Sequence, residues 1–327
     1  PYKMVLTHGF TVDEKGEKMS KSKGNVVAPD AVLKEYGSEI LRLWVASSDY
    51  QGDLKISQNI LKQSAENYRK LRNTFRIMLA NINDLKAITP YNEMGELDKW
   101  ILSEAKTVFD NVYKSFSNYN FVHGMSMLNN FIVNELSGIY IDITKDSLYC
   151  DAINDPRRTS SQSAMAIMTK SLLTLIAPIL TYTADEIVEH LPAIIKGERE
   201  DIFDFVHESI ESVESTFDAA YMNSAREKFF EIVDGLKKEK IIKNTLELVI
   251  ITESDKIAKM DKTAAEDWFV VSGISHTEIV EELGKFEVDG DIFVIQKATK
   301  AKCPRCWKYQ SADEESTCQR CSTVLDA

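Results

Sequence analysis

Four of the five cysteines could bind a metal, because they form two Cys-x-x-Cys pairs near the end of the chain. The pairs are Cys303/Cys306 and Cys318/Cys321, with eleven residues between them. Four thiolates suit tetrahedral zinc, and a site filled by four protein ligands is structural rather than catalytic. The chain shows no secretory signal, so we expect a four-cysteine zinc ribbon rather than two disulfides, inert thiols or a redox pair.

The surroundings of these cysteines suggest what the ribbon does. About thirty residues bury too little surface to fold alone, so the metal should hold them together. Basic side chains suit phosphates, and an exposed aromatic ring can stack on an unpaired base. We therefore expect nucleic-acid contacts here, and the candidates are Arg305, Trp307, Lys308 and Arg320. Trp307 could alternatively be a core residue that covers the zinc turns.

A second motif with chemical potential is the string Lys-Met-Ser-Lys-Ser at 18–22. Lys18 and Lys21 are separated by small residues and form a flexible cationic arm that could stabilise charge developing on a phosphate. The hydroxyls of Ser20 and Ser22 could donate hydrogen bonds to phosphate oxygens. An ordinary solvated loop is the alternative, and it is commoner for such a composition.

Other reactive side chains give weaker signals. The five histidines are scattered without metal-ligand spacing, and we expect Cys150 to be half-buried and not a ligand. Arg69, Arg72 and Arg76 line one side of a helix, where they could meet phosphates or simply be solvated.

The elements that position these motifs are mainly helices. Apolar residues recur at spacings of three and four in four long segments, which predicts an antiparallel bundle over about 57–195; the segments are 59–85, 97–116, 121–140 and 160–176. Thr183 and Glu186 are typical of a capping box before a further helix.

The flanking segments are more varied. Residues 4–7 look like a short strand, Pro29 fits a helix start, and 196–217 is a polar, acidic connector. Further on, we predict helices at 219–240 and 263–271 and strands at 246–251 and 291–297, which together form a small α+β unit.

Composition limits the class of protein. The 327 residues carry a net charge of −12, with 44% hydrophobic and 28% charged residues. This excludes collagen, coiled-coil rods and wholesale disorder, and suggests about two domains. No stretch approaches the ~18 apolar residues of a membrane helix. A broadly acidic chain is a poor non-specific DNA binder, yet it can still bind nucleic acid through local basic faces.

The Lys-Met-Ser-Lys-Ser string resembles the second signature of class I aminoacyl-tRNA synthetases. The segment 36–50, Tyr-Gly-Ser-Glu-Ile-Leu-Arg-Leu-Trp-Val-Ala-Ser-Ser-Asp-Tyr, is similar to the isoleucyl members of that family. Segments 140–146 and 177–186 resemble its helical anticodon-binding domain, and the Cys-Pro-Arg-Cys-Trp at 303–307 its bacterial zinc module. The resemblance spans nearly the whole chain.

This resemblance implies roles for particular residues. Lys21 would stabilise the triphosphate of ATP, present with Mg²⁺, while Lys18 assists and Met19 lies near the adenine. Segment 26–56 would dock against the tRNA stem, with Arg42 and Lys55 reaching phosphates. The family activates isoleucine with ATP and esterifies tRNA(Ile). The bundle would approach the anticodon stem and the tail the anticodon loop.

The resemblance also implies a division of the chain and a context. We expect the end of a Rossmann-type catalytic domain over 1–56, an anticodon-binding domain over 57–218, an α+β junction domain over 219–299 and the zinc module over 300–327. The first class I signature is absent, so we expect a C-terminal part that is inactive alone. A cytoplasmic monomer is expected. A stand-alone RNA-binding protein and a valyl or leucyl enzyme remain the alternatives.

Overall fold

Long helices form where the apolar periodicity predicts them in the computed structural model of the chain, which describes residues 2–276 and 280–326. The bundle helices are α3 (Gln58–Ile82), α4 (Glu96–Ser117), α5 (Phe121–Asn130) and α8 (Pro156–Ile176). The α3 helix begins where the Ser57 hydroxyl accepts a hydrogen bond from the Ile60 N–H, at 3.3 Å. The described chain is mainly helical, as predicted.

The chain divides into two compact units that alternate along the sequence. The first contains residues 1–87, 104–137 and 165–212, and the second contains 88–103, 138–164 and 213–327. The division at 56, 218 and 299 that the sequence suggests therefore remains a proposal about evolutionary domains.

The first unit begins with a loop region and short helices. Its elements before the bundle are β1 (Thr11–Val12), the 3-10 turn η1 (Lys21–Lys23), α1 (Pro29–Tyr36), α2 (Ser38–Ala46) and β2 (Leu54–Lys55). β1 and β2 pair in parallel. Residues 4–7 form no strand, contrary to the sequence prediction, and Met4 and Val5 are exposed.

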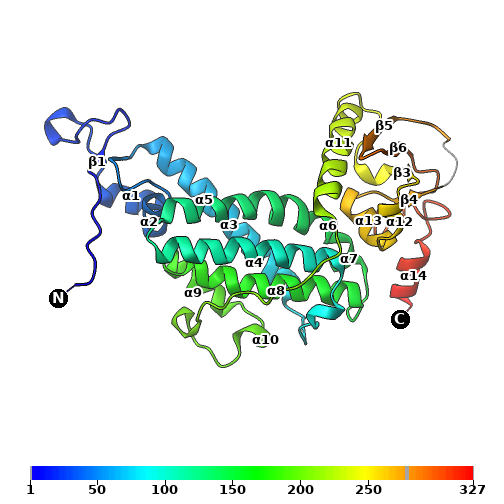
Figure 1. Ribbon diagram of the computed structural model, residues 1–327, viewed down its shortest axis with the longest axis horizontal. Helices are drawn as coiled ribbons and strands as arrows, with labels where there is room; N and C mark the ends of the chain where they lie inside the picture. Colours follow the sequence, from blue (N-terminus) through cyan, green and yellow to red (C-terminus); the bar gives the residue numbers. More distant parts are fainter. Residues whose placement is uncertain (1, 277–279, 327) are drawn as a thin grey trace. The chain divides into compact units, whose positions relative to one another are not determined.

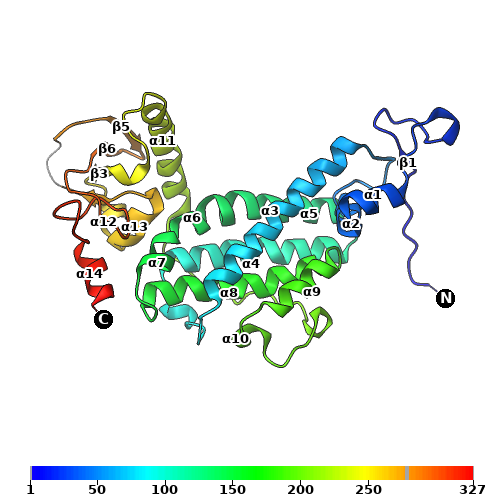
Figure 2. The ribbon, with the colours of Figure 1, turned by 180° about the vertical axis from the view of Figure 1, so that it is seen from behind.

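The helical part of the first unit encloses an apolar core. In both views, α5 and the adjoining parts of α4 and α8 run alongside one another, and α3 crosses them obliquely (Figure 1, Figure 2). Fully buried side chains fill the space between them, among them Phe75, Met78, Phe109 and Leu172. The unit ends with α9 (Thr181–Glu189), α10 (Ala193–Lys196) and the 3-10 turn η4 (Ile202–Asp204).

Two helix predictions need correction. The capping box at Thr183 is wrong, because α9 begins at Thr181 and both side chains bind elsewhere: Thr183 to Glu39, and Glu186 to Arg72. The predicted helix over 121–140 changes to π-helical hydrogen bonding at η3 (Phe131–Tyr140).

The second unit joins helix ends to a four-stranded sheet. Its helices and turns are η2 (Tyr91–Glu93), α6 (Ile141–Ile143), α7 (Lys145–Cys150), α11 (Ala219–Lys238), η5 (Thr245–Glu247), α12 (Asp255–Ala258), α13 (Lys262–Phe269) and α14 (Gln319–Leu325). The strands are β3 (Leu248–Thr252), β4 (Gly273–Ser275), β5 (Gly284–Val288) and β6 (Asp291–Lys297), in the order β4-β3-β6-β5. Within this described sheet, β3 and β4 are parallel and the other neighbours are antiparallel.

Aromatic packing holds this unit together. The Trp268 ring lies edge-on to Trp100 at 5.2 Å and against Phe217 at 4.7 Å, and its indole N–H donates to the Met222 carbonyl. Figure 1 shows α11 beside the sheet. The strand at 291–297 is confirmed, the strand predicted from 246 begins at 248, and β4 and β5 were not predicted.

Candidate functional site

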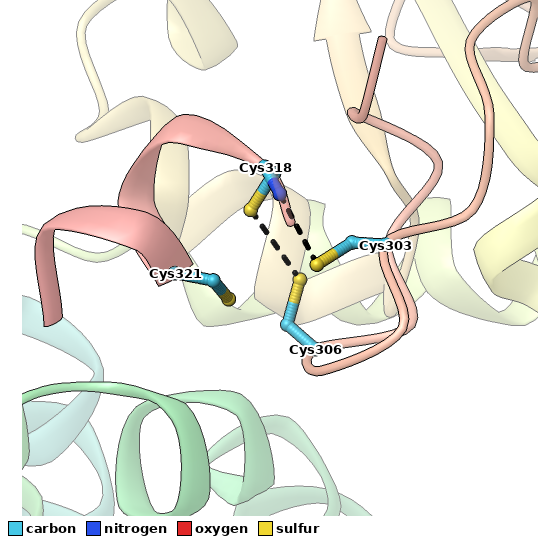
Figure 3. A group of neighbouring side chains, drawn as sticks. All are labelled: Cys303, Cys306, Cys318 and Cys321. Atoms are coloured by element: carbon cyan, nitrogen blue, oxygen red, sulfur yellow. Dashed lines mark hydrogen bonds between the residues drawn. The ribbon is translucent and has the colours of Figure 1, made fainter. Parts of the chain in front are cut away.

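The four tail cysteines converge on one point. Their sulfur atoms all lie within 4.8 Å of one another, and all four residues are buried (Figure 3). The Cys306 and Cys318 sulfurs are 3.7 Å apart. Sulfurs at about 2.3 Å from a shared tetrahedral ion would be separated by roughly 3.8 Å, so this donor set fits zinc.

Local backbone structure prepares these thiols to bind a cation. The first pair sits on a tight turn in which Trp307 donates its N–H to the Cys303 carbonyl at 3.0 Å and adopts a φ of 66°. The second pair flanks the start of α14, with Cys318 at its N-cap, where the helix dipole favours negative charge.

The electrostatics of the sulfurs agree with this role. Burial opposes ionisation of Cys303, but backbone N–H groups, first that of Cys318, outweigh it and lower the pKa to about 6. The Cys318 N–H lies 3.3 Å from the Cys303 sulfur. Burial and the neighbouring thiolates of Cys318 and Cys321 raise the pKa of Cys306. A bound cation would relieve that repulsion.

The fifth cysteine lies beside this group although it is distant in sequence. Cys150, at the end of α7, is buried in the same cluster as the four tail cysteines. It is outside the set whose sulfurs could share an ion. Burial, followed by the nearby Asp146 charge, raises the pKa of Cys150 to about 11, so its thiol stays neutral at pH 7.

Three basic residues of the tail, Arg305, Lys308 and Arg320, point into the protein. The Arg320 guanidinium binds both oxygens of Asp146, and the Arg305 Nη1 donates to the Cys150 carbonyl at 2.5 Å. The Lys308 side chain is 4% exposed, with its ammonium 3.2 Å from Asp267. The prediction that Lys308 contacts a phosphate is therefore wrong, because its charge is neutralised inside the unit.

Trp307 remains available. Its side chain is 60% exposed, so it does not cover the zinc turns as a core residue would. The Lys302 ammonium lies 5.3 Å from the centre of its ring. Lys302 is a candidate that the sequence reasoning missed, although its place just before the first cysteine was a usable signal.

The Lys-Met-Ser-Lys-Ser loop is exposed at both lysines. Lys18 and Lys21 have no ion-pair partner within the described ranges 2–276 and 280–326. The loop is anchored from behind, because Asn25 accepts the Ser20 N–H at 2.9 Å and donates to Asp13 at 2.8 Å.

The small residues of the loop are partly engaged. The Ser20 hydroxyl caps η1 and lies 3.2 Å from the Ser22 hydroxyl. Met19 packs against a core cluster that includes Val32 and Trp44. The loop therefore presents two free ammonium groups from a fixed base.

The proposed tRNA-facing arginines differ in how free they are. Arg42 donates to the carbonyls of Ile179 and Pro178, at 2.8 and 2.5 Å. Both terminal nitrogens of Arg72 bind Glu186 at 2.6 Å. These two guanidiniums hold elements of the first unit together, and their assignment as phosphate contacts lacks support from this geometry.

The other members of the set face solvent. Arg69 is exposed with only a weak pair to Glu66, at 3.6 Å. Arg76 and Lys55 are exposed and have no ion pair in the part of the chain that the structure describes. These three cations remain available for an anionic partner.

Two protein families match parts of the chain, and known proteins match its whole length. Residues 98–253 match the family described as the anticodon-binding domain of tRNA ligase, and residues 1–57 match class I tRNA synthetases (I, L, M and V). The chain is 83% identical over its whole length to an isoleucine–tRNA ligase of Sulfurimonas denitrificans, and 63% identical to that of Nitratiruptor sp.. Over its whole length, the chain is similar to part of these isoleucine–tRNA ligases.

The similarity covers only part of each relative's length. The chain spans 36% of the Sulfurimonas protein and 35% of the Nitratiruptor protein. A solved LeuRS–tRNA–LeuAMS complex from Agrobacterium radiobacter K84 overlaps 75% of this chain and 25% of its own, at 14% identity and a TM-score of 0.45. Within the described residues, none of the helices is both long and apolar enough to cross a membrane.

Proposed function

We propose that this chain is the part of an isoleucine–tRNA ligase that binds tRNA(Ile) and supplies the ATP-phosphate loop. The observation that carries the proposal is the 83% identity over all 327 residues to an isoleucine–tRNA ligase. The exposed ammonium groups of Lys18 and Lys21 and the match to an anticodon-binding domain agree with it.

The reaction proposed for the whole enzyme assigns work to the loop. The isoleucine carboxylate attacks the α-phosphorus of ATP, the bond to the β-phosphate oxygen breaks, and pyrophosphate leaves with the electron pair. Lys21, assisted by Lys18, lies on an arm whose charge would stabilise the oxygens of that leaving group. Ser20 and Ser22 would donate hydrogen bonds there, with Mg²⁺ accompanying ATP. The placement of Met19 near adenine stays part of this proposal.

The tail supplies structure and an aromatic contact. We propose that Cys303, Cys306, Cys318 and Cys321 hold one structural zinc, which organises the turn that carries Trp307. The exposed Trp307 ring would stack on an unpaired base of the anticodon loop. The protein would act as a cytoplasmic monomer.

The exposed arginines of α3 give the most direct test. Removing two phosphate contacts should weaken binding of tRNA(Ile) and reduce the slope of log affinity against log salt by roughly two. The test variant is Arg69→Ala/Arg76→Ala, measured by fluorescence anisotropy between about 50 and 200 mM salt, a range in which such slopes are resolved. Lys259→Ala/Lys285→Ala removes the same charge from exposed positions of the second unit and serves as the control.

Equal slopes for the two variants would contradict the placement of RNA on α3. A drop confined to the α3 variant supports it. Because both variants lose two positive charges, a general electrostatic effect would move them together.

A further inference from the structure

Charged groups of residues 303–325 hold the zinc module against α7. Asp146 of α7 accepts hydrogen bonds from Arg157 at 2.9 Å and from the Arg320 Nη2 at 2.7 Å, and the Lys308 ammonium lies 3.7 Å away. Arg320 and Lys308 belong to the module, whereas Arg157 belongs to α8. One carboxylate therefore joins three cations from two parts of the second unit.

Further carboxylates close the network. Asp151 binds Arg157 at 2.7 Å and Arg320 at 3.3 Å, while Asp267 of α13 binds Arg157 at 2.9 Å and Lys308 at 3.2 Å. The side chains of Asp146, Asp151 and Asp267 are 15%, 5% and 7% exposed. Solvent screens such pairs weakly, so their geometry matters more than that of surface pairs.

The burial has opposite effects on these carboxyl groups. Burial alone would raise the pKa of Asp146. The Arg320 hydrogen bond and the Lys308 charge outweigh this effect and hold its pKa well below the usual range. Burial dominates at Asp267 and raises its pKa to about 6 despite Lys308 and Arg157. Asp146 is thus the carboxylate that the cations stabilise most fully.

The module is also anchored at Ser272, which accepts hydrogen bonds from the Tyr309 N–H and the Gln310 side-chain amide. Its buried apolar residues are the cysteines themselves. Three of its basic residues, Arg305, Lys308 and Arg320, point toward α7 or α13. The module is therefore oriented mainly by polar contacts, beside the packing of its cysteines against Cys150 of α7.

We propose that Asp146 is a positioning residue that orients the zinc module on α7, so that the exposed Trp307 ring is presented to RNA at a fixed place. The RNA half of this inference rests on the proposed function. Asp146 itself touches no RNA, because its oxygens are occupied by Arg157, Arg320 and Lys308.

The inference predicts an effect of unexpected sign. Removing a negative charge near a polyanion should strengthen binding if only electrostatics matter. Loss of a positioning contact should weaken it. Asp146→Asn therefore separates the two accounts. Asp142→Asn is the matched control, since Asp142 precedes Asp146 closely in the chain and pairs with Lys145 at 2.8 Å and Arg226 at 3.9 Å rather than with the module.

The experiment measures three properties of each variant in the full chain. Cobalt absorption reports whether the four thiolates still bind metal, hydrogen exchange of residues 301–325 reports docking without RNA, and anisotropy reports tRNA(Ile) affinity. We expect Asp146→Asn to retain the cobalt–thiolate bands, to lose about 100-fold of amide protection in the tail, and to bind tRNA(Ile) about tenfold more weakly. Asp142→Asn should match the unchanged chain in the first two.

Several results would overturn the inference. Tail protection equal in the two variants would show that Asp146 does not dock the module, and unchanged or tighter RNA binding would remove its role in recognition. Should Asp146→Asn not fold, Arg320→Lys keeps the charge but loses the two-pronged contact, and it should show the same changes to a smaller extent. If the chain without substitutions binds no tRNA(Ile), the proposed function fails. The hydrogen-exchange data would still decide whether Asp146 docks the module.

Discussion

Replacing Arg157 by Met should destabilise the second unit strongly. The guanidinium donates to three carboxylates, Asp146, Asp151 and Asp267, at distances of 2.7–2.9 Å. Methionine replaces the aliphatic stem of arginine and carries no charge, so the change removes the three contacts while keeping most of the packing of the stem. The three carboxylates would then share two cations, Arg320 and Lys308.

The magnitude follows from what remains. Charge-assisted hydrogen bonds are worth about 1.5–3 kcal/mol each, which would give roughly 4.5–9 kcal/mol if all three were lost independently. However, Asp146 and Asp151 keep Arg320, and Asp267 keeps Lys308. We therefore expect about 3–5 kcal/mol, the usual cost of breaking one buried ion pair.

Native-state hydrogen exchange of the β3 amides measures the loss of stability within the second unit, because β3 lies between β4 and β6 in its sheet. Arg76→Met, at an exposed position of the first unit, should change β3 exchange by no more than about 0.5 kcal/mol. A loss below about 1 kcal/mol for Arg157→Met, within the range of exposed pairs, would refute the view that these ion pairs are shielded from solvent.

Three further predictions concern other parts of the molecule. Metal chelation should expose the four tail thiols to iodoacetamide at pH 7. The neutral thiol of Cys150 should react slowly in the metal-bound chain. Equal labelling of all five cysteines before chelation, measured by mass spectrometry, would contradict the metal site. Burial raises the pKa of Asp98, which accepts hydrogen bonds from Tyr140 and Ser160. The folded chain therefore holds a proton that the unfolded chain releases above about pH 4. Stability from this group should fall as pH rises through the folded-state pKa, and Asp98→Asn should flatten that part of a urea-denaturation series; an unchanged pH profile would argue against it. Gly124→Ala should destabilise the first unit by about 1–3 kcal/mol because the new methyl would lie 2.5 Å from the Phe116 ring, while Gly235→Ala, with open space around it, should stabilise its helix by up to about 1 kcal/mol in thermal unfolding; the same sign for both would refute the packing argument.

The sequence predicted features that depend on local pattern. Four long helices follow from apolar spacing, and the convergence of the cysteines follows from two short pairs that need a common partner. The α13 helix and the β6 strand were also found near their predicted bounds. Each of these signals lies within a short stretch of chain and requires no knowledge of distant contacts.

Features that depend on a distant partner escaped prediction. Residues 4–7 have a strand-like composition but pair with no neighbouring strand in the described structure, and Thr183 binds Glu39 rather than its own helix end. The β5 strand alternates, with Phe286 and Val288 buried, so its signal was present but short.

The same limit applies to the candidate site. A lysine or arginine in a sequence does not show whether its partner is a phosphate or a buried carboxylate. Arg42, Arg72, Lys308 and Arg320 all find partners that are far away in the chain. The position of Cys150 beside the metal cluster was equally invisible, since nearly half of the chain separates it from Cys303.

We propose that this chain recognises the isoleucine tRNA with help from its zinc tail. The most direct measurement is binding of the chain to purified tRNA(Ile), tRNA(Val) and tRNA(Leu) at one fixed salt concentration, with and without a zinc chelator. We predict preferential binding of tRNA(Ile) that chelation weakens. Equal affinity for the three tRNAs, or binding that chelation leaves unchanged, would contradict the account.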